Sequence, residues 1–513
     1  MKRLPLAFVA VAGLAQGAPP PNVLYILADD LGYGDVSAFN PRSAWPTPNI
    51  DRLAREGVAF TDAHSASALC TPSRYALLTG RYAWRGALKK DVLQGYGAPL
   101  IERGRPTVAN LLRDHGYTTA IFGKWHLGLD WVRTGPFPEN VDFTQPFAGG
   151  PLARGFDRFF GLSASLDIPP YVWLDGDRAA SLPTGTIGDS PPPRLWRAGP
   201  ISPDFRMEEV QPRLTEKTLA YLAERAAARD RKPFFLYLAL AAPHTPLLPT
   251  REFEGKTRTT TYGDFVTQID ADVGRILATL ETSGLAKNTL VIFTSDNGFA
   301  PAAGLEEQTK AHHDPSGGWR GYKSDLFEGG HRMPFIVRWP GVTTAGARCT
   351  QLVAQLDFFA TCAEMLGAKI PDSAAEDSVS LLPLLRGESA PAAARTTIVN
   401  HSGEGRFAIR EGRWKLLLWP GSGGWSPPTP NPSPWLKTAA TDLRTLPRYQ
   451  LYDLDADPDE KTNLEAAHPE IVQRLGHLLR TTIERGRSTP GAPQPYEHSA
   501  NWEQIAWMRE FSK

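Results

Sequence analysis

Apolar runs alternate with amphipathic stretches through the first three quarters of the chain. The first run, residues 22–28, is apolar at nearly every position, which is typical of a strand buried on both faces. Further buried strands are predicted at residues 117–122, 233–241 and 289–294, and helices at residues 106–115, 215–229 and 262–283. Because strands alternating with helices form parallel sheets, the pattern predicts an α/β fold with a large, mostly parallel mixed sheet sandwiched by helices.

The pattern changes after about residue 390. Residues 406–410 and 414–418, joined by a Glu-Gly turn, predict an antiparallel hairpin. A loop rich in Gly, Pro and Trp covers residues 420–435, and a helix is predicted at residues 469–485. We therefore expect a larger domain over residues 19–390 and a smaller C-terminal α+β domain with an antiparallel sheet over residues 391–513.

The N-terminus has the layout of a secretory signal peptide. Lys2 and Arg3 precede an apolar run at residues 4–14, which small residues follow at 15–18. The alternative is a buried first helix. A membrane-spanning helix is not expected, because the run is shorter than the ~20 residues that span a bilayer. We predict a signal peptide at residues 1–18 and an exported protein, periplasmic or secreted, without a transmembrane segment.

Composition excludes some classes of partner and leaves one cysteine to explain. Lys plus Arg and Asp plus Glu both total 55 of the 513 residues, so net charge gives no reason to expect nucleic acid as a partner. Three cysteines cannot build a disulfide framework. Cys349 and Cys362 either pair or act as small buried hydrophobic residues, and in both cases Cys70 remains unpaired.

Polar side chains follow each of the four predicted strands. Ligands of parallel α/β sheets bind beyond the carboxyl ends of the strands, so these side chains form a candidate site. They are Asp29 and Asp30, Lys124 and His126, His244, and Asp296 and Asn297. The oxygen ligands of Asp29, Asp30, Asp296 and Asn297 suit Ca²⁺ or Mg²⁺ better than zinc, although single Asp residues at strand ends are often caps or turns. The acidic run at residues 453–459 resembles the start of a calcium loop, but Pro458 occupies the glycine position and we predict a turn.

Cys70 lies at the predicted start of a helix. Thr71 is a suitable cap, Pro72 a suitable first residue, and Gly80 a suitable end. Cys70 would then precede a helix N-terminus, which favours an anion, and Arg74 lies one turn further on. Considered alone, Cys70 is either an activated thiol near His126 or His244, or a structural cysteine.

The segment from Cys70 to Arg81 resembles a known signature. Cys-Thr-Pro-Ser-Arg followed by Leu-Thr-Gly-Arg is similar to the motif of the type I, formylglycine-dependent sulfatases of the alkaline phosphatase superfamily. The resemblance covers nearly the whole mature chain. It extends to residues 29–30, 32–35, 123–126, 243–244, 295–298, 321–323, 451–454 and 457–458.

The resemblance implies an alkaline phosphatase-like fold, in which residues 19–390 form the catalytic domain, and a hydrolase mechanism. A maturation enzyme would convert Cys70 to formylglycine, whose hydrated aldehyde attacks the sulfur atom of a sulfate ester. One Ca²⁺ ion would be held by Asp29, Asp30, the Cys70-derived group, Asp296 and Asn297. The resemblance also implies that Asp296 acts as the base, and that His244 with Lys323 protonates or neutralises the leaving oxygen. His126 would accept the proton of the second hydroxyl. Arg74 and Lys124 would bind the hydrated aldehyde and the sulfate oxygens.

The substrate is less defined than the chemistry. Export and aromatic residues in predicted loops favour a sulfated carbohydrate, and the resemblance favours a 6-sulfated hexosamine. His313 and His401 are candidate substrate contacts or ordinary exposed loop residues. Four tryptophans in predicted loops either stack on sugar rings or pack internally; these are Trp84, Trp131, Trp319 and Trp425. Nothing in the sequence indicates the oligomeric state.

Three other functions compete with a sulfatase. A phosphate or phosphonate monoester hydrolase of the same superfamily would share the metal site and the oxidised cysteine. A sulfated-glycan-binding protein would result if Cys70 stays unmodified. A cysteine hydrolase would use the thiolate directly, but such an enzyme needs no site for a hard cation.

Overall fold

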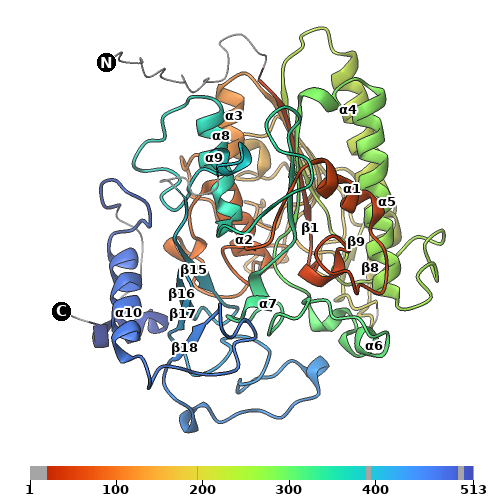
Figure 1. The fold of residues 1–513 in the computed structure, drawn as a ribbon. Coiled ribbons are helices and arrows are strands. Elements are labelled where there is room, and N and C mark those ends of the chain that lie inside the picture. The colour runs from red at the N-terminus through yellow and green to blue at the C-terminus, as the bar shows by residue number, and fades with distance from the viewer. Residues whose placement is uncertain (1–19, 193, 389–393, 495–501, 512–513) are drawn as a thin grey trace, which may run out of the picture.

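The computed structural model describes residues 20–192, 194–388, 394–494 and 502–511 (Figure 1). A large twisted sheet forms its centre, and a smaller sheet, built from the C-terminal part of the chain, lies to one side of it. The predicted signal peptide, residues 1–18, lies outside the described residues, and so does the predicted domain boundary after residue 390. None of the helices among the described residues is both long enough and apolar enough to cross a membrane.

The central sheet has ten strands and is mixed but mostly parallel. In spatial order they are β13 (Ala347–Cys349), β2 (Val58–Phe60), β12 (Phe335–Arg338), β11 (Thr289–Ser295), β1 (Asn22–Ala28), β10 (Phe234–Ala239), β4 (Thr118–Lys124), β5 (Arg158–Leu162), β6 (Leu174–Asp175) and β7 (Arg178–Ala179). The five strands from β11 to β5 run parallel, and β12 and β6 introduce antiparallel pairs on either side. The predicted fold class is confirmed.

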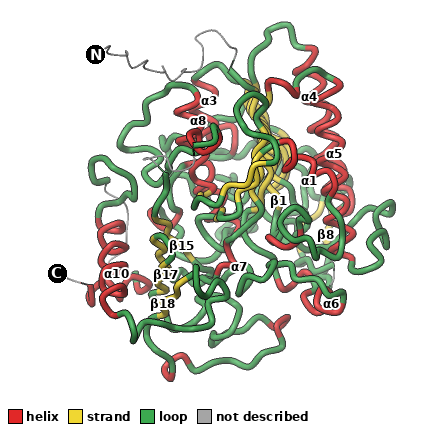
Figure 2. Tube along the Cα trace, viewed as in Figure 1, coloured by secondary structure: helices red, strands yellow, loops and turns green. Residues whose placement is uncertain are grey.

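Helices cover both faces of this sheet (Figures 1 and 2). On one face lie α1 (Pro48–Glu56), α4 (Val210–Ala227) and α5 (Thr261–Thr282), and on the other lie α2 (Cys70–Thr79), α3 (Val108–Asp114), α8 (Phe358–Met365) and α9 (Leu382–Leu385). Alternate residues of β1 enter the two cores: Leu24 and Ile26 pack on the first layer, and Tyr25 and Leu27 on the second. This explains why the strand is apolar at nearly every position, as a two-sided sheet requires.

The C-terminal domain contains a four-stranded antiparallel sheet. Its strands are, in spatial order, β15 (Thr397–His401), β16 (Phe407–Glu411), β17 (Trp414–Leu417) and β18 (Gln450–Asp453). The predicted hairpin is therefore confirmed as β16 and β17. Helix α10 (Pro469–Glu484) packs on β16 and β17 through an apolar core, and the acidic run after β18 forms turns, as predicted.

Short elements connect these parts. Two small sheets pair β3 (Ala63–His64) with β14 (Val353–Ala354) and β8 (Gly185–Ile187) with β9 (Gly199–Ile201). Two short helices, α6 (Leu305–Lys310) and α7 (Glu328–His331), lie in the segment after β11. Cys349 and Cys362 are both free thiols, so the pairing alternative is not realised, and Cys362 is a fully buried hydrophobic residue of α8.

Buried charges join the C-terminal sheet to the central domain. Lys415 Nζ of β17 lies 2.9 Å from Glu328 Oε1 of α7 and 2.8 Å from Glu460 Oε1, and all three side chains are fully buried. Arg410 of β16 pairs with Asp62, which also pairs with Arg332. We call this group the interdomain ion cluster; it comprises Asp62, His64, Glu328, His331, Arg332, Arg410, Lys415 and Glu460. Its carboxylates and its Lys and Arg side chains are equal in number, which offsets the cost of burying each charge.

One buried carboxyl makes stability depend on pH. Burial between α4 and α5 raises the pKa of Asp272 to about 6 from its usual 3.8. Because the folded pKa is raised, the folded state favours the protonated carboxyl, and this contribution to stability is fully present below pH 3.8 and lost as pH rises through 6. Above pH 6 the buried side chain is ionised and destabilises the fold, a cost that a neutral side chain avoids. We expect Asp272→Asn to raise the free energy of unfolding by about 1–3 kcal/mol at pH 7.5.

The asparagine keeps the hydrogen bonding of this site. Gln211 Nε2 donates to Asp272 Oδ2 at 2.8 Å, and Gln211 Oε1 has no partner within the described chain, so an asparagine amide can supply one. Urea unfolding at pH 7.5, 6 and 4.5 measures the effect. The stabilisation should shrink steadily toward pH 4.5, and Asp204→Asn, at an exposed position, controls for the change in net charge. A stabilisation that persists undiminished at pH 4.5 would refute the assignment.

Candidate active site

The carboxyl ends of four parallel strands deliver polar side chains to one buried site. Asp29 and Asp30 follow β1, Asp296 and Asn297 follow β11, Lys124 ends β4 with His126 close behind, and His244 follows β10 after a short turn. All ten residues of the predicted core set are buried, with exposed fractions of 0 to 8%. They are Asp29, Asp30, Cys70, Arg74, Lys124, His126, His244, Asp296, Asn297 and Lys323.

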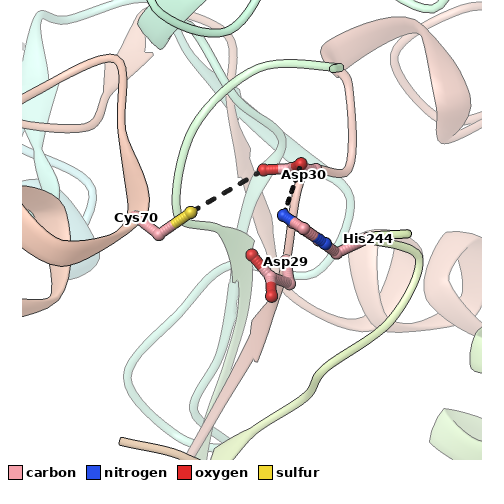
Figure 3. A group of neighbouring side chains, drawn as sticks. All are labelled: Asp29, Asp30, Cys70 and His244. Carbon is pink, nitrogen blue, oxygen red and sulfur yellow. Dashed lines mark hydrogen bonds and ion pairs between the residues drawn. The ribbon is translucent and has the colours of Figure 1, made fainter. Parts of the chain in front are cut away.

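The structure brings Cys70 into contact with these strand ends. Cys70 Sγ lies 4.0 Å from Asp30 Oδ1, and His244 Nε2 lies 3.5 Å from Asp30 Oδ2 (Figure 3). Ligand atoms of Asp29, Asp30, Cys70 and His244 all lie within 4.8 Å of one another. One metal ion can therefore be reached by side chains from three separate segments of the chain.

The free oxygen atoms at this site fit a hard cation. Asp29 Oδ1 and Asn297 Oδ1 are buried and have no hydrogen-bond partner among the described residues. Buried polar atoms without a partner are rare, and carboxylate and amide oxygens are the ligands that Ca²⁺ prefers. Asp296 is more fully occupied, because its Oδ2 accepts from Arg74 and its Oδ1 accepts from the backbone N–H of Asp30.

Cys70 is the first residue of α2, so the helix begins two residues earlier than the sequence predicts. Leu69 occupies the capping position without a side-chain hydrogen bond, so Thr71 does not cap the helix. The Thr71 hydroxyl instead accepts from the Leu93 N–H at 3.2 Å, which a local capping rule cannot foresee. The predicted end is confirmed, since Gly80 adopts a left-handed conformation at φ +64°. The uncapped N-terminal N–H groups of α2 therefore face the site.

The Cys70 thiol is not activated as a thiolate. Burial raises its pKa to about 12, although Lys124 and Lys323 lie close enough to oppose part of that rise. A neutral thiol is a weak nucleophile and a weak ligand. This observation counts against a cysteine hydrolase that would use the unmodified side chain.

Three buried cations surround the carboxylates. Lys124 Nζ lies 2.7 Å from Asp29 Oδ2, Lys323 Nζ lies 2.7 Å from Asp30 Oδ1, and Arg74 Nη2 lies 2.8 Å from Asp296 Oδ2. Burial alone would raise the pKa of Asp29, but Lys124 and the other nearby cations hold it below its usual value. Burial opposes the charge of Lys323, yet Asp30 outweighs it and the pKa of Lys323 rises. The nearby cations therefore keep Asp29 ionised, and each of the three buried cations is paired with one carboxylate of the site.

The two histidines differ in their free nitrogen atoms. His126 Nε2 lies 2.8 Å from the Leu93 carbonyl and must donate to it, which leaves Nδ1 with a lone pair and no partner among the described residues. Burial, with Lys124 and Arg74 nearby, lowers the pKa of His126 well below its usual value. His244 Nδ1 lies 2.6 Å from the Thr245 carbonyl, so its Nε2 faces Asp30. His126 is thus a neutral base, and His244 directs its second nitrogen into the site.

Two site residues adopt unusual backbone conformations. Asp30 has φ +64° and His126 has φ +56°, in the left-handed region that non-glycine residues seldom occupy. Such conformations persist only where the surrounding structure fixes them, and they concentrate at functional sites. Tyr262 supports the first of them by donating to the Asp30 carbonyl at 3.3 Å.

The two candidate substrate contacts have buried side chains. His313 uses both ring nitrogens, one at 2.7 Å from Asp35 Oδ1 and the other accepting from the Ala44 N–H at 3.2 Å. His401 is 2% exposed, packs on Phe407, and burial lowers its pKa to about 3. Neither ring offers an accessible surface to a substrate. Trp84 and Trp131 are also buried, whereas Trp319 and Trp425 are partly exposed.

One residue near the site was not anticipated. Asp167 is 8% exposed, and its Oδ1 lies 3.9 Å from His244 Nδ1 without a hydrogen-bond partner among the described residues. It follows β5, which ends at the same edge of the sheet as β4. The strand-end argument would have identified Asp167 if the apolar segment at residues 158–162 had been recognised as a strand.

Comparison with known proteins places this site in context. The Sulfatase family profile matches residues 21–368, and a profile for the N-sulphoglucosamine sulphohydrolase C-terminal region matches residues 318–421. An N-acetylgalactosamine-6-O-sulfatase of Bacteroides thetaiotaomicron is 34% identical, over 92% of this chain and 94% of its own length. Human arylsulfatase A is 34% identical, over 92% of this chain and 89% of its own length.

A solved structure has the same fold. It comes from work on the metabolism of multiple glycosaminoglycans by Bacteroides thetaiotaomicron, and it superimposes with a TM-score of 0.79 at 33% sequence identity. The alignment covers 91% of this chain and all of the other. Both the central sheet and the C-terminal domain are therefore shared with a protein of known structure.

Proposed function

The chain belongs to the sulfatase family, which makes it a sulfuric ester hydrolase, and from this premise we propose that it removes sulfate from a sulfated carbohydrate through a formylglycine made from Cys70. The observation that carries the proposal is the position of Cys70. It begins a helix beside a carboxylate and an amide that each have one unpartnered oxygen, and three buried cations lie around it. A tetrahedral, monoanionic sulfate ester needs these features around its reacting atom.

Conversion of Cys70 to formylglycine would explain how a buried side chain with a poorly nucleophilic thiol becomes the nucleophile. A thiol whose pKa is raised to about 12 is a poor nucleophile at neutral pH, whereas a hydrated aldehyde at the same position provides two hydroxyl groups. Cys70 is 2% exposed, so a maturation enzyme cannot reach it in the folded chain. Conversion must therefore precede folding, and we infer that this enzyme acts on the unfolded chain.

The residues present can hold one Ca²⁺ ion. Asp29, Asp30 and Asn297 would provide oxygen ligands, and Asp296 lies beside them with Oδ2 occupied by Arg74. A bound calcium ion supplies positive charge that stabilises the transferring sulfate group. Arg74, Lys124 and Lys323 add fixed positive charge around the same position, as a phosphoryl-transfer site does.

Proton transfer is divided between the two histidines. His244 directs Nε2 into the site and, with Lys323, would donate a proton to the leaving oxygen of the sugar. The neutral Nδ1 of His126 would accept a proton from the second hydroxyl of the modified residue 70, so that sulfate leaves and the aldehyde forms again. Asp296 would act as the base that accepts the proton of the attacking hydroxyl.

The names of the relatives narrow the substrate class. N-acetylgalactosamine-6-sulfatases from bacteria and mammals align over nearly the whole chain, which favours a 6-sulfated hexosamine as the sugar. Such a substrate agrees with our proposal that residues 1–18 direct export to the periplasm or the medium, where sulfated polysaccharides occur.

Mass spectrometry of the peptide that contains residue 70 tests the proposal. With a formylglycine-generating enzyme co-expressed, we expect a loss of about 18 Da, the difference between CH₂SH and CHO. The converted protein should release sulfate from a 6-sulfated hexosamine at least ~100-fold faster than it hydrolyses the matching phosphate ester. Faster phosphate hydrolysis would favour the monoester phosphatase alternative, and an unmodified thiol despite active co-expression would refute the mechanism.

A further inference from the structure

A pocket of about 470 Å³ opens beside the active site, between the central domain and the C-terminal domain. We call it the lateral pocket. It is lined chiefly by Leu69, Lys90, Ser324, Glu404, Arg406 and Trp425. Its volume lies within the ~300–1,000 Å³ typical of small-molecule sites.

Two floor segments of the lateral pocket are chain neighbours of the proposed catalytic residues. Leu69 directly precedes Cys70, and Ser324 directly follows Lys323. The Ser324 N–H donates to the Ala68 carbonyl at 2.8 Å, which fixes the two floor segments together. The lining of the pocket is thus one residue along the chain from both Cys70 and Lys323.

The C-terminal domain supplies the walls and anchors them to that floor. The Gly403 N–H donates to the Ser324 carbonyl at 2.9 Å, and the Asp91 N–H donates to the Gly403 carbonyl at 2.9 Å. The Trp425 N–H donates to Asp325 Oδ1 at 2.8 Å, two residues from Lys323. These contacts fix the backbone that carries Trp425, whose half-buried side chain lines the pocket.

The polar lining offers donors and acceptors of both signs. Lys90 and Arg406 are accompanied by the carboxylates of Asp91, Glu404 and Glu503. Arg406 stacks over Trp419 at 3.6 Å, and its Nε is buried without a partner among the described residues. The pocket therefore carries no excess of positive charge for a second anionic group, but it suits hydroxyl groups and the apolar face of a sugar ring.

We propose that the lateral pocket binds an uncharged sugar unit joined to the sulfated sugar, with Trp425 packing on its ring. This inference rests on the proposed function. It predicts that the enzyme distinguishes an oligosaccharide from a single sulfated sugar, because binding energy from the neighbouring unit contributes to catalysis at the sulfate. It also predicts that a neutral neighbour is preferred to a uronic acid.

Substrate comparison with converted enzyme tests the assignment. Three substrates are needed: a 6-sulfated hexosamine, its disaccharide with a neutral hexose, and its disaccharide with a hexuronic acid. We expect kcat/KM for the neutral disaccharide to exceed that for the monosaccharide by about three- to tenfold, the equivalent of one aromatic contact. Trp425→Ala should reduce this ratio to about 1, and Trp425→Phe, which keeps a ring, should restore most of it.

Trp435→Ala is the matched control, since Trp435 lies in the same loop but outside the lateral pocket. It should leave the ratio as in the wild type. A wild-type ratio near 1, a preference for the uronic acid, or a ratio that survives Trp425→Ala would each overturn the inference while leaving the sulfatase intact. Absence of sulfate release from the monosaccharide and both disaccharides would instead refute the proposed function, and with it this inference.

Discussion

Replacing Cys70 by alanine is expected to lower kcat for sulfate release at least ~1,000-fold, because it removes the only atoms from which the nucleophile can be made. The loss should appear with every sulfate ester, irrespective of the sugar. The carboxylates and cations around residue 70 remain in place, so the variant should still bind substrate. Steady-state kinetics on a small sulfate ester and binding of the same ester measure the two quantities separately.

Cys362→Ala is the appropriate control for this experiment. Cys362 is also a free, fully buried cysteine, but it lies in α8 within an apolar core. Its replacement should lower stability by about 1 kcal/mol through lost packing and leave kcat within twofold of the wild type. A Cys70→Ala protein that retains more than a tenth of the wild-type kcat would show that residue 70 is not the nucleophile.

Removal of one neutral ligand, by Asn297→Ala, is expected to weaken Ca²⁺ binding at least tenfold and to lower kcat about 100-fold at limiting Ca²⁺. Asn297 Oδ1 is buried without a partner among the described residues, so a bound ion is the partner that this oxygen would gain. The amide Nδ2 donates to Asp30 Oδ1 at 2.7 Å, so the variant also loses that hydrogen bond in the metal-free protein. Isothermal titration of chelator-treated protein with CaCl₂ measures the affinity. The melting temperature provides a second readout, since Ca²⁺ at 100 times its Kd stabilises the folded state by about 2.7 kcal/mol.

Two controls accompany the calcium measurement. Asn288→Ala, at an exposed position before β11, should bind Ca²⁺ as the wild type does. MgCl₂ should stabilise the wild type less than CaCl₂, because Mg²⁺ demands smaller, near-octahedral coordination and keeps its waters. If millimolar CaCl₂ leaves the melting temperature of chelator-treated wild type unchanged, the four strand-end residues do not form a calcium site.

Local sequence patterns predicted which polar side chains meet at the carboxyl edge of the parallel strands. Asp29 and Asp296 both follow long apolar runs, and parallel strands place such residues at one edge by geometry alone. The same reasoning failed where the pattern was short. Strand β5 has five residues and begins with an exposed arginine, so Asp167 beside His244 was overlooked.

Other features depend on contacts between distant segments, which one sequence does not encode in any local pattern. Thr71 is a residue type that commonly caps helices, but its hydroxyl accepts a hydrogen bond from the Leu93 N–H, and the helix begins at Cys70. His401 looks like an exposed loop residue, yet it ends a strand and packs on Phe407. The interdomain ion cluster joins residues 62, 328 and 415, whose pairing follows from the tertiary fold alone.

That cluster also limits how the protein can be divided. A shortened chain that ends before β15 would lose Arg410 and Lys415, so Asp62 and Glu328 would each lack one of their paired cations. The apolar side chains of Leu326 and Phe327, which precede α7, would also become exposed. Conversely, the isolated C-terminal segment would carry those cations on an uncovered sheet face. Shuffling of the C-terminal segment between relatives, in evolution or in engineering, should therefore succeed only when the matching charges on both sides of the junction travel together.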